Sequence, residues 1–364
     1  MYKDVPKVTL LLVVRNERKY VKRALYSLLT QSYPREKTEI IVIDGFSSDG
    51  TREWLHKKIR ELRNRMVNIK MYDNPGKILT IGWNIGIRKA NGDIICRIDA
   101  HSEISNDYIE KGVETLLKMK KEGVVCVGGV LEHIGTSFIG KAIANLFSSI
   151  FGVGNSPFRT NKYLETRFSK PSFTDTAVYG LYWKKIFEEV GYFDENLKRN
   201  QDIELHYRII KKGYKFVTHP EMRIKYYVRN TISKLLKKAF SDGYWVILSE
   251  RSFFRHKVPM YFVSYLLFTT IFFIGGMFFR IPFFYVFLCL IPLIVYIIGD
   301  IFFSMKDGDS FSKILLLFLF PLFHISYGLG SLKGLTKKFI NRTVYKFVNG
   351  KNIFEKVFRK ISKI

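Results

Sequence analysis

Residues 94–101 read Ile94-Ile95-Cys96-Arg97-Ile98-Asp99-Ala100-His101, a short apolar run that ends in an acidic residue. Such a run is typical of a buried strand in a parallel sheet. In an extended segment a spacing of two directs side chains to one face, so Asp99 and His101 are expected to point the same way. Their oxygen and nitrogen atoms could ligate a divalent cation together with a ligand's phosphates. Alternatively, the stretch is only a strand end followed by a polar turn.

Apolar, strand-like runs alternate with helix-like segments through the first part of the chain. Strands are predicted at residues 8–14, 39–43, 68–72, 93–98 and 123–130, and helices at 79–90, 107–121 and 184–190. Another helix carries Val21, Leu25, Leu28 and Leu29 on one face. This alternation predicts an open, mostly parallel α/β sheet, whose ligands bind outside the carboxyl ends of the strands. The polar residues at those ends are Arg15, Asn16, Glu17, Asp44, Asp99 and His101.

A second polar cluster lies at residues 199–208 and reads Arg199-Asn200-Gln201-Asp202-Ile203-Glu204-Leu205-His206-Tyr207-Arg208. We expect Asn200 or Gln201 to cap a helix, with Asp202 in its first turn, where the helix dipole stabilises an ionised carboxylate. Leu205 and Ile209 are expected to face the core. Compensation of the dipole alone is the alternative account of Asp202.

Two segments between these clusters allow more than one interpretation. Residues 137–150 have an amphipathic pattern, typical either of a lipid-facing rim or of an ordinary packed helix. Residues 152–159 are rich in glycine, serine, asparagine and proline, which favours a mobile substrate loop.

The formal net charge of +27 is compatible with nucleic acid, an anionic membrane surface or a polyphosphate ligand. The membrane surface is favoured because lysines crowd beside apolar segments. The sequence shows no RNA-binding aromatic signature and no helix-turn-helix pattern, so no nucleic-acid partner is expected. The spacing of Cys96, Cys126 and Cys289 predicts neither a disulfide nor structural zinc, which fits a reducing compartment. Because residues 1–6 carry no apolar signal region, we expect the first part of the chain to stay in the cytosol.

Apolar stretches at residues 258–279, 281–304 and 314–332 are each close to the length that crosses a bilayer. Residues 231–257 mix lysines with aromatic and apolar residues, as interfacial helices do. We therefore expect an α/β domain over 1–230, interfacial helices over 231–257, a membrane region over 258–332 and a basic amphipathic tail over 333–364. Three crossings would place that tail outside, against the positive-inside rule, so either one segment is re-entrant or the topology follows the first spans and not the tail. A cytoplasmic tail with an interfacial helix at 353–361 is favoured.

Taken together, four motifs resemble the inverting family 2 glycosyltransferases of the GT-A fold, and especially their membrane-bound succinoglycan and exopolysaccharide glucosyltransferase branch. The motifs occur in the family's order at residues 13–17, 43–51, 97–101 and 200–205. The resemblance implies that a nucleotide-diphosphate sugar is the donor and that Mn²⁺ or Mg²⁺ is required. No Gln-x-x-Arg-Trp motif of processive synthases is found, so processive polymerisation is not expected.

The resemblance also implies roles for individual residues. Asp202 would be the catalytic base, and Asp99 and His101 would occupy the metal motif, where the family more often has two aspartates. The residues expected to bind the sugar nucleotide are Val14, Arg15, Glu17, Asp44, Lys77, Arg97 and Asp99. Glu204, Arg208 and Lys77 are secondary candidates for orienting the base or the phosphates, or for plain ion pairing.

The membrane region suggests a lipid-linked, polyprenyl-borne saccharide acceptor and contact with membrane lipids. The main alternative is a polyprenyl-phosphate sugar synthase, whose acceptor is already ionised and has less need of a base. A nucleotidyltransferase is disfavoured because residues 14–17 do not form a glycine-rich phosphate loop. A non-catalytic membrane scaffold with a relic nucleotide fold is the third class.

Overall fold

The computed structural model describes residues 5–154, 156, 158–159, 170–249, 254–279, 282–309 and 311–361. Its sheet has the order β3-β2-β1-β4-β8-β6-β9-β5, and β7 pairs with β9. The first strands are β1 (Val8–Val14), β2 (Thr38–Asp44), β3 (Ile69–Asp73), β4 (Ile94–Asp99) and β5 (Ser102–Ile104). The later strands are β6 (Val124–Ile134), β7 (Ser172–Thr174), β8 (Leu181–Trp183) and β9 (Lys215–Tyr227).

The half of the sheet formed by β3, β2, β1 and β4 is parallel, as the alternation in the sequence predicts. Every residue of β1 is buried, which explains its unbroken apolar and β-branched run. The other half is mixed, because β8 runs antiparallel to both β4 and β6. The α/β prediction is thus confirmed, with a parallel half joined to a mixed half.

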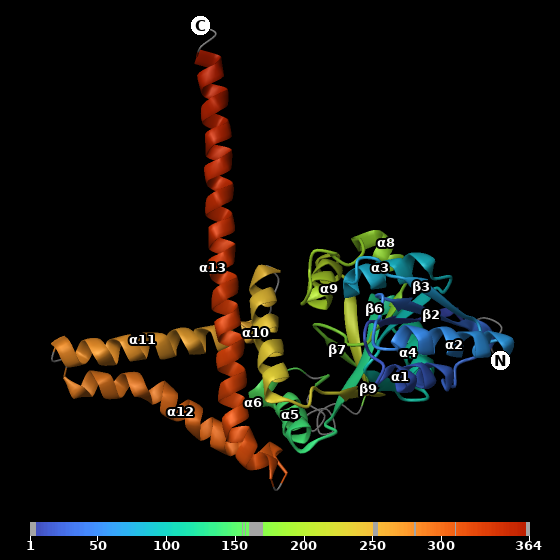
Figure 1. Ribbon diagram of the computed structural model, residues 1–364, viewed down its shortest axis with the longest axis horizontal. Helices are drawn as coiled ribbons and strands as arrows, with labels where there is room; N and C mark the ends of the chain where they lie inside the picture. Colours follow the sequence, from blue (N-terminus) through green and yellow to red (C-terminus); the bar gives the residue numbers. More distant parts are fainter. Residues whose placement is uncertain are drawn as a thin grey trace. The chain divides into compact units, whose positions relative to one another are not determined.

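Helices cover both faces of the sheet. Figure 1 shows α3 (Leu79–Lys89), α8 (Lys185–Val190) and α9 (Gln201–Lys211) above the strands. Below the strands lie α1 (Val21–Leu29), α2 (Thr51–Asn64) and α4 (Tyr108–Lys118). The helix expected to reach residue 121 ends at Lys118, and a 3₁₀ turn, η2 (Lys120–Glu122), leads into β6. The expected helix faces are confirmed, since Leu205 and Ile209 are fully buried.

Two glycines let α3 approach the sheet closely. A Cβ atom at Gly82 would lie 2.6 Å from a methyl group of Val13, and one at Gly86 would lie 2.1 Å from a methyl group of Leu11. Val13 and Leu11 lie in the central strand, where neighbouring side chains leave them no room to move. The spacing of four residues places both glycines on the same face of α3.

The chain divides into two compact units, one comprising Met1–Lys234 and Val295–Phe320, the other Leu235–Ile294 and Pro321–Ile364. In the first unit, α5 (Phe138–Ser148) is a packed helix, because five apolar side chains on it are buried and Asn145 donates to Ser312 Oγ at 2.9 Å. After α5, the short helix α6 (Ile150–Val153) places Phe151 among the rings of Tyr296, Phe303 and Phe320, at centroid distances of 5.1–5.3 Å. The end of α12 and the start of α13 thus pack on the sheet domain.

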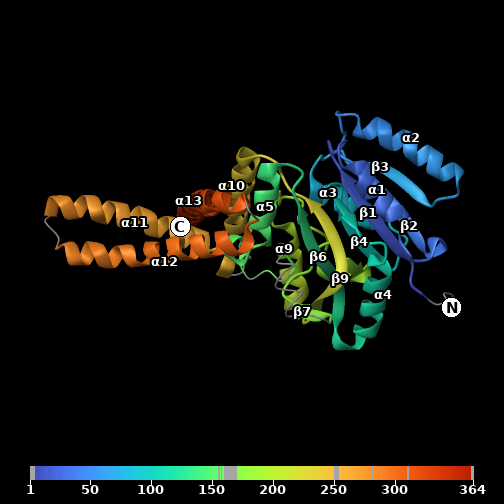
Figure 2. The same cartoon turned by 90° about the horizontal axis from the view of Figure 1, so that it is seen from below.

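Three helices in the described part of the chain are long and apolar enough to cross a membrane, over Val258–Gly276, Phe287–Asp307 and Ser312–Ile340. They belong to α11 (Val258–Phe279), α12 (Phe283–Asp307) and α13 (Ser312–Ile361). Figure 2 shows α11 beside α12, and Tyr265 donates to the Cys289 carbonyl at 2.6 Å. The expected separate helix at 353–361 is instead the end of one continuous helix, α13.

In the second unit, α10 (Ile232–Leu248) packs against α13 through small residues. Cβ atoms at Gly330 and Gly334 would lie 2.0 and 2.6 Å from the carbonyl oxygens of Phe240 and Tyr244. Ser326 donates to the Leu236 carbonyl at 2.9 Å. Such close backbone contact between small residues spaced by four is a usual way for helices to associate in membranes.

Gly86→Ala tests the close packing of α3. Helix propensity alone favours alanine over glycine by about 1 kcal/mol. We expect the reverse here, a loss of about 1–3 kcal/mol in the free energy of unfolding, because the new methyl group overlaps Leu11. Thermal or denaturant unfolding measures the change, and Lys89→Ala, at an exposed position of the same helix, is the control. A Gly86→Ala protein as stable as wild type would contradict the packing argument.

Candidate active site

The carboxyl ends of four parallel strands meet at one edge of the sheet. In the strand register, Val14 pairs with Asp44, Asp44 pairs with Asp73, and Val13 pairs with Asp99. This edge is where open α/β sheets bind their ligands. The acids predicted from the sequence therefore lie in one row, and Asp73 joins them as a member that the sequence reasoning missed.

The loops that follow β1 and β2 are bound to each other. The Asn16 N–H donates to Ser47 Oγ at 2.9 Å, and the Ser48 N–H donates to Asn16 Oδ1 at 2.9 Å. The Glu17 N–H donates to Thr51 Oγ1 at 3.0 Å. Side chains and backbone thus satisfy each other across the two loops, which fixes the positions of Arg15 and Glu17.

Asp44 is fully buried and organises the loop after β2. Its Oδ1 accepts a hydrogen bond from Ser47 Oγ at 2.6 Å, and its Oδ2 lies 2.7 Å from Arg52 Nη1. Arg52 also pairs with Asp73 at 2.8 Å, and hydrogen bonds to Asp73 and Asp44 raise the pKa of its guanidinium. Half of the Asp73 side chain is exposed, so Asp73 is the more accessible acid of the pair.

Two residues after Asp44, Phe46 is 44% exposed and has two cations near its ring. Arg52 Cζ is 5.2 Å and Lys77 Nζ is 5.8 Å from the ring centroid. Arg15 Nη1 donates to the Lys77 carbonyl at 3.2 Å, so Lys77 is held at the same edge. An exposed aromatic face with adjacent cations is suited to contact with a base and its phosphates.

The geometry at Asp99 and His101 differs from the extended segment expected from the sequence. The strand β4 ends at Asp99, and Ala100 and His101 form a turn before β5. The premise that alternation in an extended chain aligns the two side chains is therefore wrong. Tyr179 Oη donates to Asp99 Oδ2 at 3.0 Å, and His101 Nδ1 lies 3.4 Å from Glu17 Oε1.

These contacts hold one atom each of the Asp99 and His101 side chains. Tyr179 fixes the Asp99 carboxylate through one oxygen, and a carboxylate at Nδ1 favours the His101 tautomer whose Nε2 is free to ligate. No group of three or more His, Cys, Asp or Glu side chains within the described ranges is arranged to hold a metal. A pair of donors still suits Mg²⁺ or Mn²⁺, since such ions often take one or two protein ligands and complete their shell with phosphates and water. The residues thus fit the implied ion.

Asp202 lies in the first turn of α9 and faces β4 across a buried ion pair. Its Oδ1 is 2.7 Å from Arg97 Nη2, at an angle too poor for a hydrogen bond. Arg97 is buried beside the rings of Trp83 and Phe193, whose centroids lie 4.0 and 5.0 Å from its Cζ and 4.8 Å from each other. Although 39% of the Asp202 side chain remains exposed, loss of solvation raises the pKa of its carboxyl, and the Arg97 charge opposes that rise. Asp202 is therefore reachable, and its protonated form is favoured more than in a free aspartate.

Two other charged residues of α9, Glu204 and Arg208, pair with each other. Arg208 is bound by Glu204 at 2.7 Å and donates to the carbonyls of Val190, Gly191 and Tyr192. This geometry favours the ion-pairing interpretation of Glu204 and Arg208 over a role in orienting the base. Asn200 is the N-cap residue of α9, as predicted, although it makes no side-chain capping bond and has a φ of 65°.

Backbone strain concentrates at this edge of the sheet. Among the described residues, six other than glycine have positive φ angles, and five of them lie in loops named above, at Asn16, Phe46, Lys77, Tyr179 and Asn200. Left-handed conformations are costly for bulky side chains and persist where surrounding contacts enforce them. Their clustering here marks a preorganised site.

Residues 152–159, expected to form a mobile substrate loop, are partly packed. The helix α6 takes up Ile150–Val153, and Phe158 is buried in the core, with its carbonyl bonded to the Leu131 N–H at 2.7 Å. Asn155 and Pro157 lie outside the described residues. The charge of Arg159, at the end of this segment, lowers the pKa of the Asp202 carboxyl.

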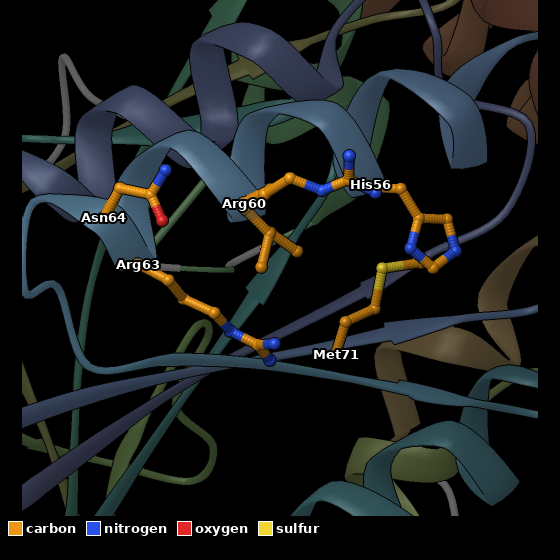
Figure 3. A pocket seen from close by; sticks show the side chains of 6 residues that line it. His56, Arg60, Arg63, Asn64 and Met71 are labelled. Carbon is orange, nitrogen blue, oxygen red and sulfur yellow. The ribbon is translucent and has the colours of Figure 1, made fainter.

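A cavity of about 300 Å³ lies elsewhere, between α2 and β3. Figure 3 shows its lining, formed by His56, Ile59, Arg60, Arg63, Asn64 and Met71. None of these residues belongs to the row of strand ends. The candidate active site is therefore located by the charged side chains at the strand ends and not by this cavity.

The chain is similar to known proteins in sequence and in fold. Residues 9–191 match Glycosyl transferase family 2. A dolichyl N-acetyl-alpha-D-glucosaminyl phosphate 3-beta-D-2,3-diacetamido-2,3-dideoxy-beta-D-glucuronosyltransferase of Methanococcus voltae is 30% identical over 239 residues, covering 65% of this chain and 71% of that relative. The succinoglycan biosynthesis protein ExoA of Rhizobium meliloti is 30% identical over 230 residues, covering 63% of this chain and 65% of that relative.

Among solved structures, a mannosyltransferase from Pyrobaculum calidifontis in complex with GDP-Man and Mn²⁺ superposes with a TM-score of 0.56 at 15% identity. The match covers 92% of this chain and 89% of that one. The fold is thus that of GT-A glycosyltransferases. The chain belongs to glycosyltransferase family 2, as the motifs predict.

Tyr179→Phe tests the orientation of Asp99. Removing the hydroxyl frees the carboxylate to rotate, and loss of such a supporting bond typically costs about 10- to 100-fold in metal affinity. We expect the Mn²⁺ concentration for half-maximal glycosyl transfer to rise by that factor. The control is Tyr108→Phe, which removes a 2.9 Å bond to the Tyr179 carbonyl but none to Asp99. Equal Mn²⁺ requirements in wild type and Tyr179→Phe would refute the role of the hydroxyl.

Proposed function

We propose that this chain is a membrane-bound, metal-dependent, inverting glycosyltransferase. It transfers a sugar from a nucleoside diphosphate sugar, a UDP-sugar by the habit of the family, to a hydroxyl group of a lipid-linked saccharide. The observation that carries the proposal is the meeting of Asp202 with β4. Asp202 pairs with Arg97 on β4, the strand that ends at Asp99. Two acids more than a hundred positions apart in the chain are thus associated with one strand.

The donor binds along the interlocked loops after β1 and β2. Val14, Arg15, Glu17 and Asp44 form or support the nucleoside end, and Lys77 brings a cation toward the phosphates. Since Asp44 is buried and already bonded to Ser47 and Arg52, its contribution includes holding the loop in shape. A preformed loop lowers the ordering cost of binding.

On the leaving-group side of the sugar, Asp99 and His101 would hold Mn²⁺ or Mg²⁺. The ion would neutralise the charge that develops on the leaving diphosphate. The nitrogen donor of His101 is better tolerated by Mn²⁺ than by Mg²⁺. Tyr179 and Glu17 keep the two ligands oriented.

On the opposite side of the sugar, where the acceptor enters, Asp202 takes the proton of the acceptor hydroxyl as the oxygen attacks the anomeric carbon. Arg97 pairs with Oδ1, which leaves Oδ2 for the acceptor hydroxyl. A general base placed in this way contributes about 10²- to 10⁴-fold in rate. Because the attack comes from the face opposite the leaving group, a single displacement inverts the anomeric configuration.

The acceptor is proposed to be polyprenyl-linked because three apolar helices accompany the sheet domain. Phe151 packs against the end of α12 and the start of α13 and so connects these helices to that domain. The saccharide of a lipid-linked acceptor could then react while its lipid stays in the bilayer. We place the enzyme in the cell membrane as a multi-pass protein with its catalytic domain, residues 1–230, in the cytoplasm. Residues 231–257 would lie in the interface and 258–332 in the bilayer, where one of the three apolar segments is re-entrant, so that 333–364 returns to the cytoplasmic surface.

Asp202→Asn tests the proposed function. The amide keeps the shape but accepts no proton, so transfer to a lipid-linked saccharide should fall by about 10²- to 10⁴-fold. Donor binding, followed as thermal stabilisation by UDP-sugars with Mn²⁺, should remain. Asp194→Asn, in a turn that the amide can maintain, is the control. Substantial residual transfer in Asp202→Asn would favour an ionised phosphate acceptor instead.

The pH dependence of transfer follows from the environment of Asp202. The base works when ionised, so kcat/KM should fall as the pH drops through its pKa, which burial raises above the ordinary 3.8. The charges facing it are Arg97 and Arg159, which lower this pKa, and Asp99, which raises it. Arg97→Met should therefore move the acidic limb to higher pH. A limb that stays in place or moves to lower pH would contradict the assignment.

A further inference from the structure

The acid predicted to meet the nucleoside, Asp44, has both carboxylate oxygens occupied. The residue is fully buried. Its Oδ1 accepts from Ser47 Oγ at 2.6 Å, and its Oδ2 accepts from the Ser47 N–H at 3.2 Å and pairs with Arg52 Nη1 at 2.7 Å. A nucleobase could bond to Asp44 only by displacing one of these partners, and breaking a buried hydrogen bond to a charged group is costly. A base at this edge of the sheet therefore needs another acceptor.

Asp73 supplies that acceptor at the end of the neighbouring strand. It is the register partner of Asp44 and lies in β3, the first strand in the sheet order. Half of its side chain is exposed. Arg52 Nη1 lies 2.8 Å from Oδ1, whereas the described part of the chain places no hydrogen-bond donor on Oδ2. Asp73 thus presents one open carboxylate oxygen next to the buried Asp44.

One arginine joins the two acids. The guanidinium of Arg52 has donors on three nitrogens, and it contacts both Asp44 and Asp73 through Nη1. Among the described residues, its Nε and Nη2 have no acceptor, and a quarter of the side chain is exposed. Because the buried Asp44 holds Nη1, the guanidinium stays next to Asp73. The two residues at the surface therefore offer an acceptor beside a donor.

Phe46 gives this place an aromatic surface at the cost of backbone strain. Its φ is 55°, in the left-handed region that glycine adopts easily and bulky residues rarely do. The residue is 44% exposed, so burial in the core does not account for the strain. Strained residues of this kind cluster at ligand-binding sites. Arg52 Cζ lies 5.2 Å from the ring centroid, so the aromatic ring and the donor group belong to one site.

The ring and the charged pair would act differently on a bound base. Every base has a π face, so stacking on Phe46 adds affinity without choosing between bases. The choice requires hydrogen bonds to the edge of the base. An acceptor beside a donor matches an edge with a ring N–H beside a carbonyl oxygen. Uracil and guanine have such an edge, whereas adenine and cytosine have no ring N–H there.

We infer that Phe46, Arg52 and Asp73 form the nucleobase subsite of the donor and that Asp73 is its specificity-determining residue. Asp73 Oδ2 accepts from the ring N–H, Arg52 donates to the adjacent carbonyl oxygen, and Phe46 stacks on the base. Asp44 positions Arg52 and does not contact the base. The inference rests on the proposed function, which supplies the nucleotide sugar.

The first measurement is the affinity of the full chain for UDP, GDP, ADP and CDP with Mn²⁺, by isothermal titration calorimetry. UDP or GDP should bind about tenfold or more tightly than ADP and CDP. Methylating the ring nitrogen of the preferred nucleotide, as N3-methyl-UDP or N1-methyl-GDP, should weaken its binding about 10- to 100-fold, since a hydrogen bond to a charged group is lost. Preference for ADP or CDP would overturn the inference, as would equal affinities for the parent and methylated nucleotides.

Variants assign the discrimination to one residue. Asp73→Ala should bind the parent and methylated nucleotides equally, whereas Asp73→Asn, whose amide oxygen still accepts, should keep part of the preference. Phe46→Ala should weaken the binding of both forms alike and leave their ratio unchanged. The control is Glu61→Ala, which removes an exposed acid paired with Lys58 elsewhere on α2 and should change neither affinity. An Asp73→Ala protein that still rejects the methylated form would refute the role of Asp73.

These binding measurements separate the inference from the proposed function. They involve no transfer, so an Asp202→Asn protein that keeps its transfer activity contradicts the catalytic proposal alone. A preference for GDP contradicts the UDP-sugar donor and supports the subsite. If none of the four nucleotides binds, the proposed donor class is wrong and the inference fails with it.

Discussion

The ion pair between Arg97 and Asp202 is the interaction on which the site depends. A guanidinium buried against Trp83 and Phe193 needs a negative partner, because removing a charge from water is costly unless it is paired. Asp202 supplies that partner from the first turn of α9. The pair therefore ties a strand of the parallel half of the sheet to a helix that follows much later in the chain. A buried ion pair contributes little net stability, but here it defines where the carboxylate lies.

Around this pair the fold supplies rigidity at the cost of local strain. Strand ends are fixed by the register of β1, β2, β3 and β4, and the loops that leave them bond to one another. Tyr179 adopts a left-handed conformation while its hydroxyl reaches Asp99, and its carbonyl accepts a hydrogen bond from Tyr108. The well-packed sheet beneath, with α3 seated closely through Gly82 and Gly86, holds these conformations in place. The strained backbone conformations at the site persist because the closely packed sheet beneath them enforces them.

The sequence predicted the parallel half of the sheet, the acids at its edge and the family, because strand-like runs and polar strand ends are local signals. Contacts made across the fold were not predictable in this way. Nothing near Tyr179 in the sequence indicates that its hydroxyl meets Asp99, and nothing near Glu17 indicates that it faces His101. The alignment of Asp99 with His101 was expected for the wrong reason, since the chain turns after Asp99. The pairing of Asp73 with Arg52 likewise arises only when distant elements pack.

In the proposed mechanism the sugar lies between a leaving group on the Asp99 side and an attacking hydroxyl on the Asp202 side. The most direct test is the anomeric configuration of the first product, read from the ¹H NMR coupling of its anomeric proton after transfer from an α-linked donor to a lipid-linked saccharide. The account predicts a β-linked product. An α-linked product would contradict it, because retention requires a chemistry that a single base facing the acceptor does not provide.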